Sequence, residues 1–168
     1  MQTNTVQMWR NGVSRFKPSG ETIRTRDYDV TAIHPTTAKQ FVCAHHYSHA
    51  FPASRRCYGL FRGGSLCGVA VYSVPMHTGV LRGLPDPESS TELGRLVLLD
   101  QEPTNSESWF IARTFDLLRS DGFTGVVSFS DPVPRHDQSG QQVFRGHIGQ
   151  IYQASNAIYC GTATARTI

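Results

Sequence analysis

Long apolar runs, lysine and closely spaced cysteines are all scarce in this chain of 168 residues. The longest apolar run, Leu66–Tyr72, is far too short for a bilayer-spanning helix, which needs about 20 residues. Met1–Gly12 is polar and contains no apolar signal-peptide core. Since 39% of the residues are nevertheless hydrophobic, the chain can bury a core. We expect a cytoplasmic globular protein of one domain, without a membrane partner.

The four cysteines contain no C-x-x-C pair, which argues against both a disulfide framework and a zinc ribbon. In a reducing cytoplasm we expect all four to be free thiols. They are Cys43, Cys57, Cys67 and Cys160.

The shortage of lysine leaves arginine as the main cation, because only Lys17 and Lys39 among 16 basic residues are lysines. Arginine suits planar recognition of phosphate and bases, although a GC-rich genome gives the same bias. Residues 1–27 hold five basic and two acidic residues, whereas the remainder is balanced. We therefore expect a basic N-terminal arm over 1–27, read either as a nucleic-acid contact or as a solvated tail, followed by a single domain over 28–168. The candidate DNA contacts are Arg10, Arg15, Lys17, Arg55, Arg56 and Arg82.

Hydrophobic periodicity and turn residues predict alternating strands and helices. A hairpin across Gly63-Gly64-Ser65 and a helix opened by the capping-box pattern Thr104-x-x-Glu107 are the clearest local signals. The expected strands are 29–33, 57–62, 66–74, 93–99, 125–130 and 157–164; the expected helices are 36–46, 105–120 and 147–156; the expected loops are 76–90 and 132–145. This order predicts an α/β fold with a mixed central sheet and helices on both faces. It is similar to the acetyltransferase fold known as GNAT, although several other α/β folds of this size fit the same order.

The densest chemistry lies in the segment His45-His46-Tyr47-Ser48-His49. His45 and His49 share a helix face, but the glutamate of a zincin motif is missing. With a carboxylate from elsewhere, two imidazoles would resemble the two-histidine-one-carboxylate site of non-haem iron. The alternative is that these side chains cap carbonyls and pack. Asp131 is the best candidate carboxylate because it follows a buried strand, although Asp-Pro is also ordinary turn chemistry.

Two further positions allow more than one interpretation. Thr104–Ser108, at the start of a helix, offers backbone N–H groups and hydroxyls that suit a phosphate, or that simply cap the helix. Tyr152 follows Asp131 in a late helix, where its phenol is either a general acid or one more core aromatic.

Several short segments share their order and spacing with one family: His46-Tyr47-Ser48, Glu92-Leu93-Gly94-Arg95-Leu96, Asn105-Ser106-Glu107-Ser108, Ser128-Phe129-Ser130-Asp131, Gly149-Gln150-Ile151-Tyr152-Gln153-Ala154-Ser155-Asn156 and Tyr159-Cys160-Gly161. Together they resemble the Mom family of phage DNA-modification proteins, over about Val30 to Thr164. That family is regarded as a divergent GNAT acyltransferase, which agrees with the element order.

The resemblance implies a transferase that converts adenine in double-stranded or locally opened DNA to an N6-carbamoylmethyl (methylcarbamoyl) derivative, protecting phage DNA from restriction. It implies an active-site and metal group of His46, Tyr47 and Asp131, with iron as the suggested ion and Tyr152 as an active-site tyrosine. The family-like segments near the expected site for acetyl-CoA or a related acyl donor contain Arg95, Asn105, Ser106 and Ser108.

The sequence departs from this pattern in two places. Asp100–Ser108 contains no glycine, whereas the usual GNAT pyrophosphate loop is glycine-rich, and the 132–145 loop is longer than the family usually carries. Two other functions therefore stand beside the first: a conventional GNAT N-acetyltransferase acting on a small amine or a protein, and a non-enzymatic DNA-binding accessory module.

Overall fold

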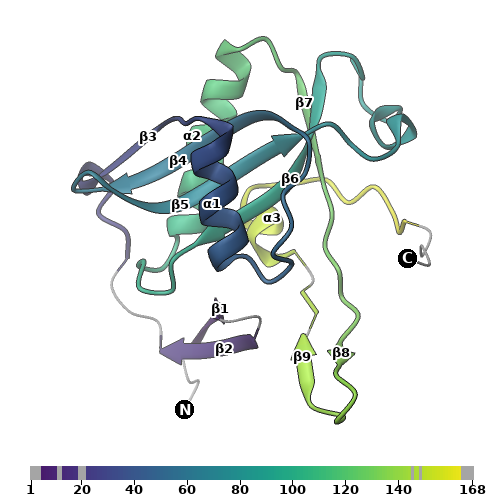
Figure 1. Ribbon diagram of the computed structural model, residues 1–168. Helices are drawn as coiled ribbons and strands as arrows, with labels where there is room; N and C mark the ends of the chain where they lie inside the picture. Colours follow the sequence, from purple (N-terminus) through teal and green to yellow (C-terminus); the bar gives the residue numbers. More distant parts are fainter. Residues whose placement is uncertain (1–4, 11–12, 19–21, 145, 148, 164–168) are drawn as a thin grey trace.

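A five-stranded sheet forms the centre of the protein (Figure 1), and the computed structural model describes residues 5–10, 13–18, 22–144, 146–147 and 149–163. The sheet order is β3-β4-β5-β6-β7. The first four strands pair antiparallel, and β7 pairs parallel to β6. The strands are β3 (Tyr28–Ala32), β4 (Ser54–Arg62), β5 (Ser65–Ser73), β6 (Ser90–Leu98) and β7 (Gly125–Ser128).

Helices cover both faces of this sheet, because the central strands are apolar on both sides. The helix α1 (Pro35–His45) buries Ala38 and Val42 against Cys57, Val69 and Val71. The opposite face carries Tyr58, Leu60, Ala70 and Tyr72, which pack on Phe110, Ile111 and Leu118 of α2 (Ser106–Ser120). Figure 1 shows α1 and α2 on opposite sides of the sheet, with the short α3 (Gln150–Ala154) near β6. The α/β fold with a mixed sheet is thus confirmed.

Most of the expected elements are present. The β4–β5 hairpin forms as predicted, since Gly63 and Gly64 adopt φ values of 55° and 81° that favour glycine. The helix α2 ends where Gly122 takes φ 87° after Asp121. The 76–90 loop contains only the short 3-10 helix η2 (Thr78–Leu81). The four cysteines are free, as expected.

Four local predictions were wrong. Asn105, not Thr104, is the N-cap of α2, and it takes a left-handed φ of 68° with no side-chain capping bond. The late helix is only α3, since Gly149 in the left-handed region precedes it and Asn156 at φ 57° follows it. Residues 157–163 form no strand. The 132–145 loop contains a small hairpin of β8 (Arg135–His136) and β9 (Gln142–Phe144).

The N-terminal segment contains the antiparallel pair β1 (Thr5–Arg10) and β2 (Val13–Pro18), and the 3-10 helix η1 (Thr25–Asp27) precedes β3. The side chains of Arg10, Arg15 and Lys17 lie outside the described part of the structure. Within the described ranges, no helix combines the length and the apolar character that crossing a membrane requires.

The sheet opens between β6 and β7. Their last paired residues are Leu93 and Ser128, whereas β6 continues to Leu98. On its other edge, β6 bulges, because Val71 pairs with Arg95 and Tyr72 pairs with Leu93, which leaves Gly94 as the extra residue. A bulge bends a strand and re-aims its side chains, and here it lies at the point where β7 separates from β6.

Substitution of Gly94 should destabilise the bulge, because a Cβ there would lie 2.4 Å from Ser73 Oγ and 3.3 Å from Pro52 Cγ. We expect Gly94→Ala to lower the free energy of unfolding by about 1–3 kcal/mol. Gly83→Ala is the matched control, since nothing lies within 4 Å of its Cβ position. Urea denaturation compares the two variants, and equal stability of Gly94→Ala and wild type would contradict this description of the bulge.

Candidate active site

A cleft occupies the opening between β6 and β7. Its walls come from the end of α1, the second half of β6, the segment after β7, and the chain around α3, so elements far apart in the sequence meet here. The lining residues are His45, His46, Tyr47, Glu92, Leu93, Gly94, Arg95, Leu96, Val97, Leu98, Asp100, Glu107, Phe129, Ser130, Asp131, His147, Gln150, Ile151 and Tyr152. The structure thus brings together His46, Tyr47, Asp131, Tyr152 and Arg95, all of which sequence analysis singled out.

His46 follows α1, and the residue is 8% exposed. Its Nδ1 accepts a hydrogen bond from the Ser48 backbone N–H at 3.1 Å and lies 2.9 Å from Ser48 Oγ. Burial lowers the pKa of His46 to about 3, and the nearby charges of Arg95, His49 and His147 act in the same direction. The imidazole is therefore neutral at physiological pH, and it stacks obliquely on Tyr47 with ring centroids 4.3 Å apart.

Tyr47 and Asp131 both line the cleft and interact electrostatically. Burial raises the pKa of Tyr47, Arg95 lowers it, and the Asp131 carboxylate raises it. Asp131 follows β7, and its Oδ1 accepts a bond from the Val133 N–H at 3.1 Å while its Oδ2 pairs with Arg135. The Asp131 carboxylate is thus held by its own loop.

Tyr152 and Glu92 both line the cleft and are partly buried. Burial raises the pKa of Tyr152, whereas the neighbouring Ser128 hydroxyl lowers it. Burial also raises the pKa of Glu92, and Arg95 partly opposes this. Arg95 itself donates to the carbonyl oxygens of Ala50 at 3.0 Å and Gly94 at 2.6 Å. The cleft therefore combines a phenol and a carboxylate that both hold a proton more tightly than usual.

Sequence analysis did not single out Glu92 and His147 as site residues, although both line the cleft. Glu92 appears in the segment that resembles the family, but only the end of β6–β7 pairing shows that its side chain lines a cleft. His147 reaches the cleft because its N–H donates to the Asp131 carbonyl at 2.7 Å. No local sequence pattern predicts that contact between two loops.

The other expected donor-binding residues lie apart from the cleft lining. At the start of α2, the Ser108 hydroxyl donates to the Asn105 carbonyl at 3.2 Å, and Ser106 is fully buried. The residue of this turn that lines the cleft is Glu107, whose negative charge opposes a phosphate at the helix N-terminus. The first turn of α2 thus lacks both the glycine-rich loop and the charge that suit a pyrophosphate.

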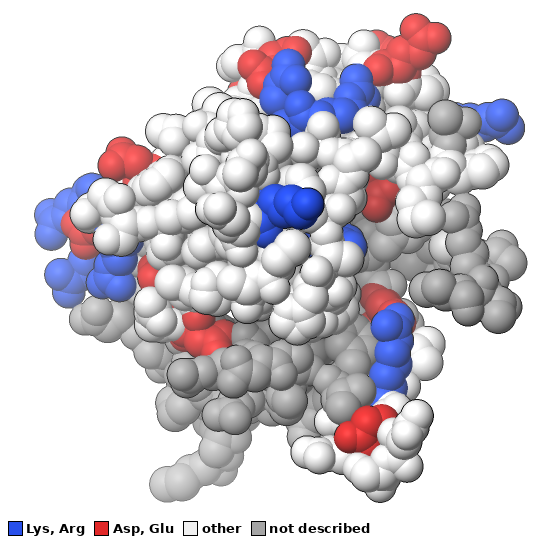
Figure 2. Space-filling view, in the orientation of Figure 1, with Lys and Arg blue, Asp and Glu red and all other residues white. Residues whose placement is uncertain are grey.

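The predicted DNA-contact arginines are dispersed. Arg55 donates to the Ser90 carbonyl at 2.6 Å, and Arg56 pairs with Asp121 at 2.7 Å, both next to the Phe123 ring. Arg82 is exposed at the end of η2. On the face drawn in Figure 2, the Lys and Arg residues of the described chain lie in small separate groups, not in one continuous basic surface.

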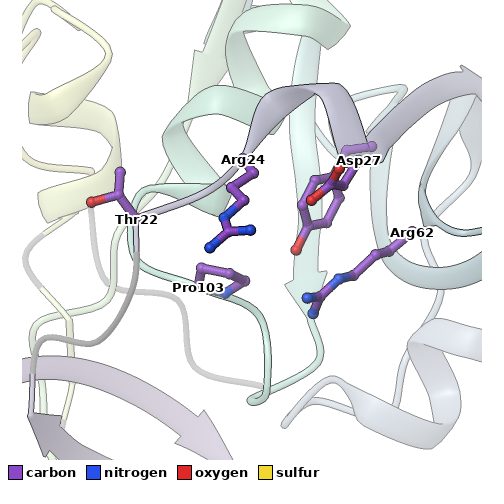
Figure 3. Close-up of a pocket in the computed structure, with 6 residues that line it drawn as sticks. Thr22, Arg24, Asp27, Arg62 and Pro103 are labelled. Carbon is purple, nitrogen blue, oxygen red and sulfur yellow. The ribbon is translucent and has the colours of Figure 1, made fainter.

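A second, smaller hollow lies between η1 and the loop that joins β6 to α2 (Figure 3). Arg24 and Arg62 extend their guanidinium groups toward it. Beside it, the buried Glu102 accepts a hydrogen bond of 2.5 Å from the Tyr28 hydroxyl and lies 3.9 Å from Arg62. These contacts neutralise a buried carboxylate, so we assign them a structural role.

Two of the three side chains expected to hold iron already make hydrogen bonds within the protein. His46 Nδ1 already accepts from the Ser48 N–H, and both carboxylate oxygens of Asp131 accept bonds, from Val133 and Arg135. Within the described residues, no group of three or more His, Cys, Asp or Glu side chains is placed to hold a metal ion. The iron implied by the resemblance is therefore not supported by this donor set.

The fold has relatives among solved structures. It is similar to a ribosomal-protein-alanine N-acetyltransferase from Brucella melitensis biovar Abortus 2308, with 14% identity and a TM-score of 0.52, covering 84% of this chain and 98% of that one. It is also similar to an aminoglycoside acetyltransferase from an uncultured soil metagenomic sample, in complex with sisomicin, with 9% identity and a TM-score of 0.51, covering 85% and 97% of the two chains. The fold is thus that of the GNAT acetyltransferases, as the element order predicts.

Within this fold class, the chain belongs to the Mom protein family, whose sequence pattern matches residues 27–167. The match includes β3, all the strands that follow it, and every part of the cleft wall. Comparison with curated proteins finds no match.

The buried neutral His46 makes stability depend on pH. Between about 3 and its ordinary value of 6.5, the unfolded chain binds a proton that the folded chain does not. Stability therefore falls as pH falls through this window, by about 1 kcal/mol per pH unit for this residue. His147, whose pKa burial also lowers, contributes with the same sign.

Urea denaturation at pH 7 and pH 5.5 tests this. We expect His46→Gln to lose less stability than wild type between the two pH values, whereas the exposed His136→Gln should retain the full wild-type loss. Identical pH dependence in all three proteins would show that His46 is not buried as described.

Proposed function

We propose that this protein is a GNAT-type acyl-group transferase that modifies adenine in DNA and yields the N6-carbamoylmethyl derivative, which would protect phage DNA from restriction. The observation that carries the proposal is the match to the Mom protein family over residues 27–167, which includes every wall of the cleft between β6 and β7. The convergence of His46, Tyr47, Asp131 and Tyr152 in that cleft supports it.

The acceptor sets the first chemical demand. The N6 amine of adenine is a poor nucleophile because its lone pair is delocalised into the ring, so a base must take a proton as N6 attacks. Glu92 suits this role, since burial raises the pKa of its carboxyl toward the working pH. Tyr152 suits the opposite role, because its phenol keeps its proton and can donate it to a leaving thiolate or alkoxide.

The donor sets the second demand. In GNAT-type acyl transfer, a strand that has lost its neighbour can hold an extended acyl donor by its backbone, and β6 beyond Leu93 offers such an edge. Acetyl-CoA or a related acyl donor remains the proposed class. Glu92, Asp100 and Glu107 give the cleft acidic walls, which favour an acyl group that carries an ammonium, such as glycyl.

A glycyl group also fits the product. The glycyl and carbamoylmethyl groups are isomers. Acyl transfer bonds N6 to the carbonyl carbon of the glycyl group, whereas in the final product the nitrogen on C6 is bonded to the methylene carbon. If the free glycyl amine then attacks C6 and the original C6–N6 bond breaks, the original N6 becomes the carbamoyl nitrogen. No oxidant or reductant is needed. We propose this order, acyl transfer followed by rearrangement.

DNA must bring the base to the cleft. Adenine has to leave the duplex stack or be met in locally opened DNA, at a cost of a few kcal/mol that contacts to the DNA backbone must offset. Arg82 and the 76–90 loop are the proposed contacts within the body, together with Arg10, Arg15 and Lys17 of the N-terminal segment. Arg55 and Arg56 are weaker candidates, because each already binds a protein oxygen.

Nucleoside mass spectrometry of plasmid DNA tests the function. Expression in bacteria should produce a modified deoxyadenosine with the mass of a carbamoylmethyl or glycyl adduct, and DNA from cells with empty vector should not contain it. Feeding glycine labelled with ¹⁵N should place the label at the bridging nitrogen rather than in the carbamoyl group. Unmodified DNA, together with acetylation of free amines by the purified protein, would favour the conventional N-acetyltransferase instead.

Substitutions in the cleft test the proposed proton transfers. We expect Glu92→Gln and Tyr152→Phe each to lower the modification rate by roughly 10²–10⁴-fold, since each removes one proton-transfer group. Glu88→Gln is the matched control, because Glu88 is exposed outside the cleft. If Glu92→Gln were as active as Glu88→Gln, Glu92 would not be the base.

A further inference from the structure

The hydrogen bonds at Nδ1 determine which ring nitrogen of His46 carries the proton. Its Nδ1 faces two groups of Ser48, the backbone N–H at 3.1 Å and Oγ at 2.9 Å. A backbone N–H can only donate, so Nδ1 must carry a lone pair. In a neutral imidazole, the proton then resides on Nε2.

The bond from the Ser48 N–H also rules out a second proton on the ring, because Nδ1 cannot carry a proton while it accepts that bond. His46 is 8% exposed, and the charged or titratable groups around it are Arg95 of β6, His49 of the following turn and His147 beyond Asp131. Nε2–H is consequently the polar group that the ring can offer to a molecule in the cleft, and within the described residues it has no hydrogen-bonding partner.

We propose that His46 is a neutral hydrogen-bond donor that stabilises the oxyanion of acyl transfer, and that Ser48 positions it by holding Nδ1. The inference rests on the proposed function. When N6 attacks the donor carbonyl, an N–C bond forms, the carbonyl π electrons move to oxygen, and Glu92 takes the N6 proton. Nε2–H donates to this oxygen without giving up its proton. The intermediate then collapses, re-forming C=O and expelling the thiolate or alkoxide, which takes the Tyr152 proton.

Donation to the oxyanion requires a proton on Nε2, whereas metal ligation through Nε2 requires that atom to be unprotonated. A metal bound through Nε2 needs a lone pair there, and Nδ1 would then have to donate, which the Ser48 N–H forbids. A neutral donor near a developing oxyanion is worth roughly 10²–10³-fold in rate, which sets the size of the expected loss.

Long-range ¹H–¹⁵N NMR of the histidine rings tests the proposal without any assay of DNA modification. In the full-length protein, the His46 ring, assigned by its loss in His46→Gln, should show the Nε2–H tautomer from pH 5 to pH 8. Under anaerobic conditions, one equivalent of Fe²⁺ should leave its signals unbroadened. A Nδ1–H tautomer, an imidazolium at pH 6, or selective broadening of His46 by Fe²⁺ would overturn it.

The rate of DNA modification provides a second test of the proposal. His46→Ala should lower the modification rate about 10²–10³-fold, whereas His46→Gln, whose amide can still donate, should recover a measurable part of that loss. His136→Gln, on the exposed β8, is the control for the substitution itself. If His46→Gln were as inactive as His46→Ala, the side chain at this position would not act as a hydrogen-bond donor. If no protein modifies DNA, the proposed function fails, while the NMR result still decides the tautomer and the metal.

Discussion

The parting of β7 from β6 after the Leu93–Ser128 pair is the constraint on which the rest of the site depends. If β7 extended as far as β6 does, it would pair with the edge of β6 from Gly94 to Leu98. Because β7 stops early, this stretch of β6 becomes a wall of the cleft. The bulge at Gly94 lies at the same level, and no larger residue fits there, since Ser73 and Pro52 crowd the Cβ position.

Burial then determines the protonation of the side chains that line the cleft. The same desolvation that lowers the pKa of His46 raises those of Glu92 and Tyr152. A neutral N–H donor, a carboxyl with a raised pKa and a protonated phenol thus coexist in one cleft. These are the groups that addition of a weak amine to a carbonyl calls for: a base, an acid and a donor to the oxyanion. Asp131 contributes mainly by ordering its loop, through Val133, Arg135 and the carbonyl that binds His147.

Sequence reasoning predicted what depends on local patterns. Alternating apolar residues and two glycines determine the β4–β5 hairpin, and an apolar stripe with Asp121-Gly122 determines the length and end of α2. It failed where conformation depends on distant contacts: the left-handed Asn105, the short α3, and the coil at 157–163, whose Ile158 and Tyr159 are exposed. The site shows the same division. Motifs alone identify His46, Tyr47, Asp131 and Tyr152 as candidates. The position of Glu92 in the cleft follows only from the strand register, and the protonation of the His46 ring follows only from its bond to Ser48.

The proposed function requires that adenine from DNA enter the cleft between β6 and β7. Photocrosslinking with a duplex that carries a photoreactive adenine analogue at one position, followed by peptide mapping, measures this directly. If adenine binds there, the crosslinks should lie in peptides that contain residues 92–98, 129–131 or 150–154, and they should disappear when unlabelled DNA competes. Crosslinks confined to residues 1–27, or to the outer face of α1, would contradict it.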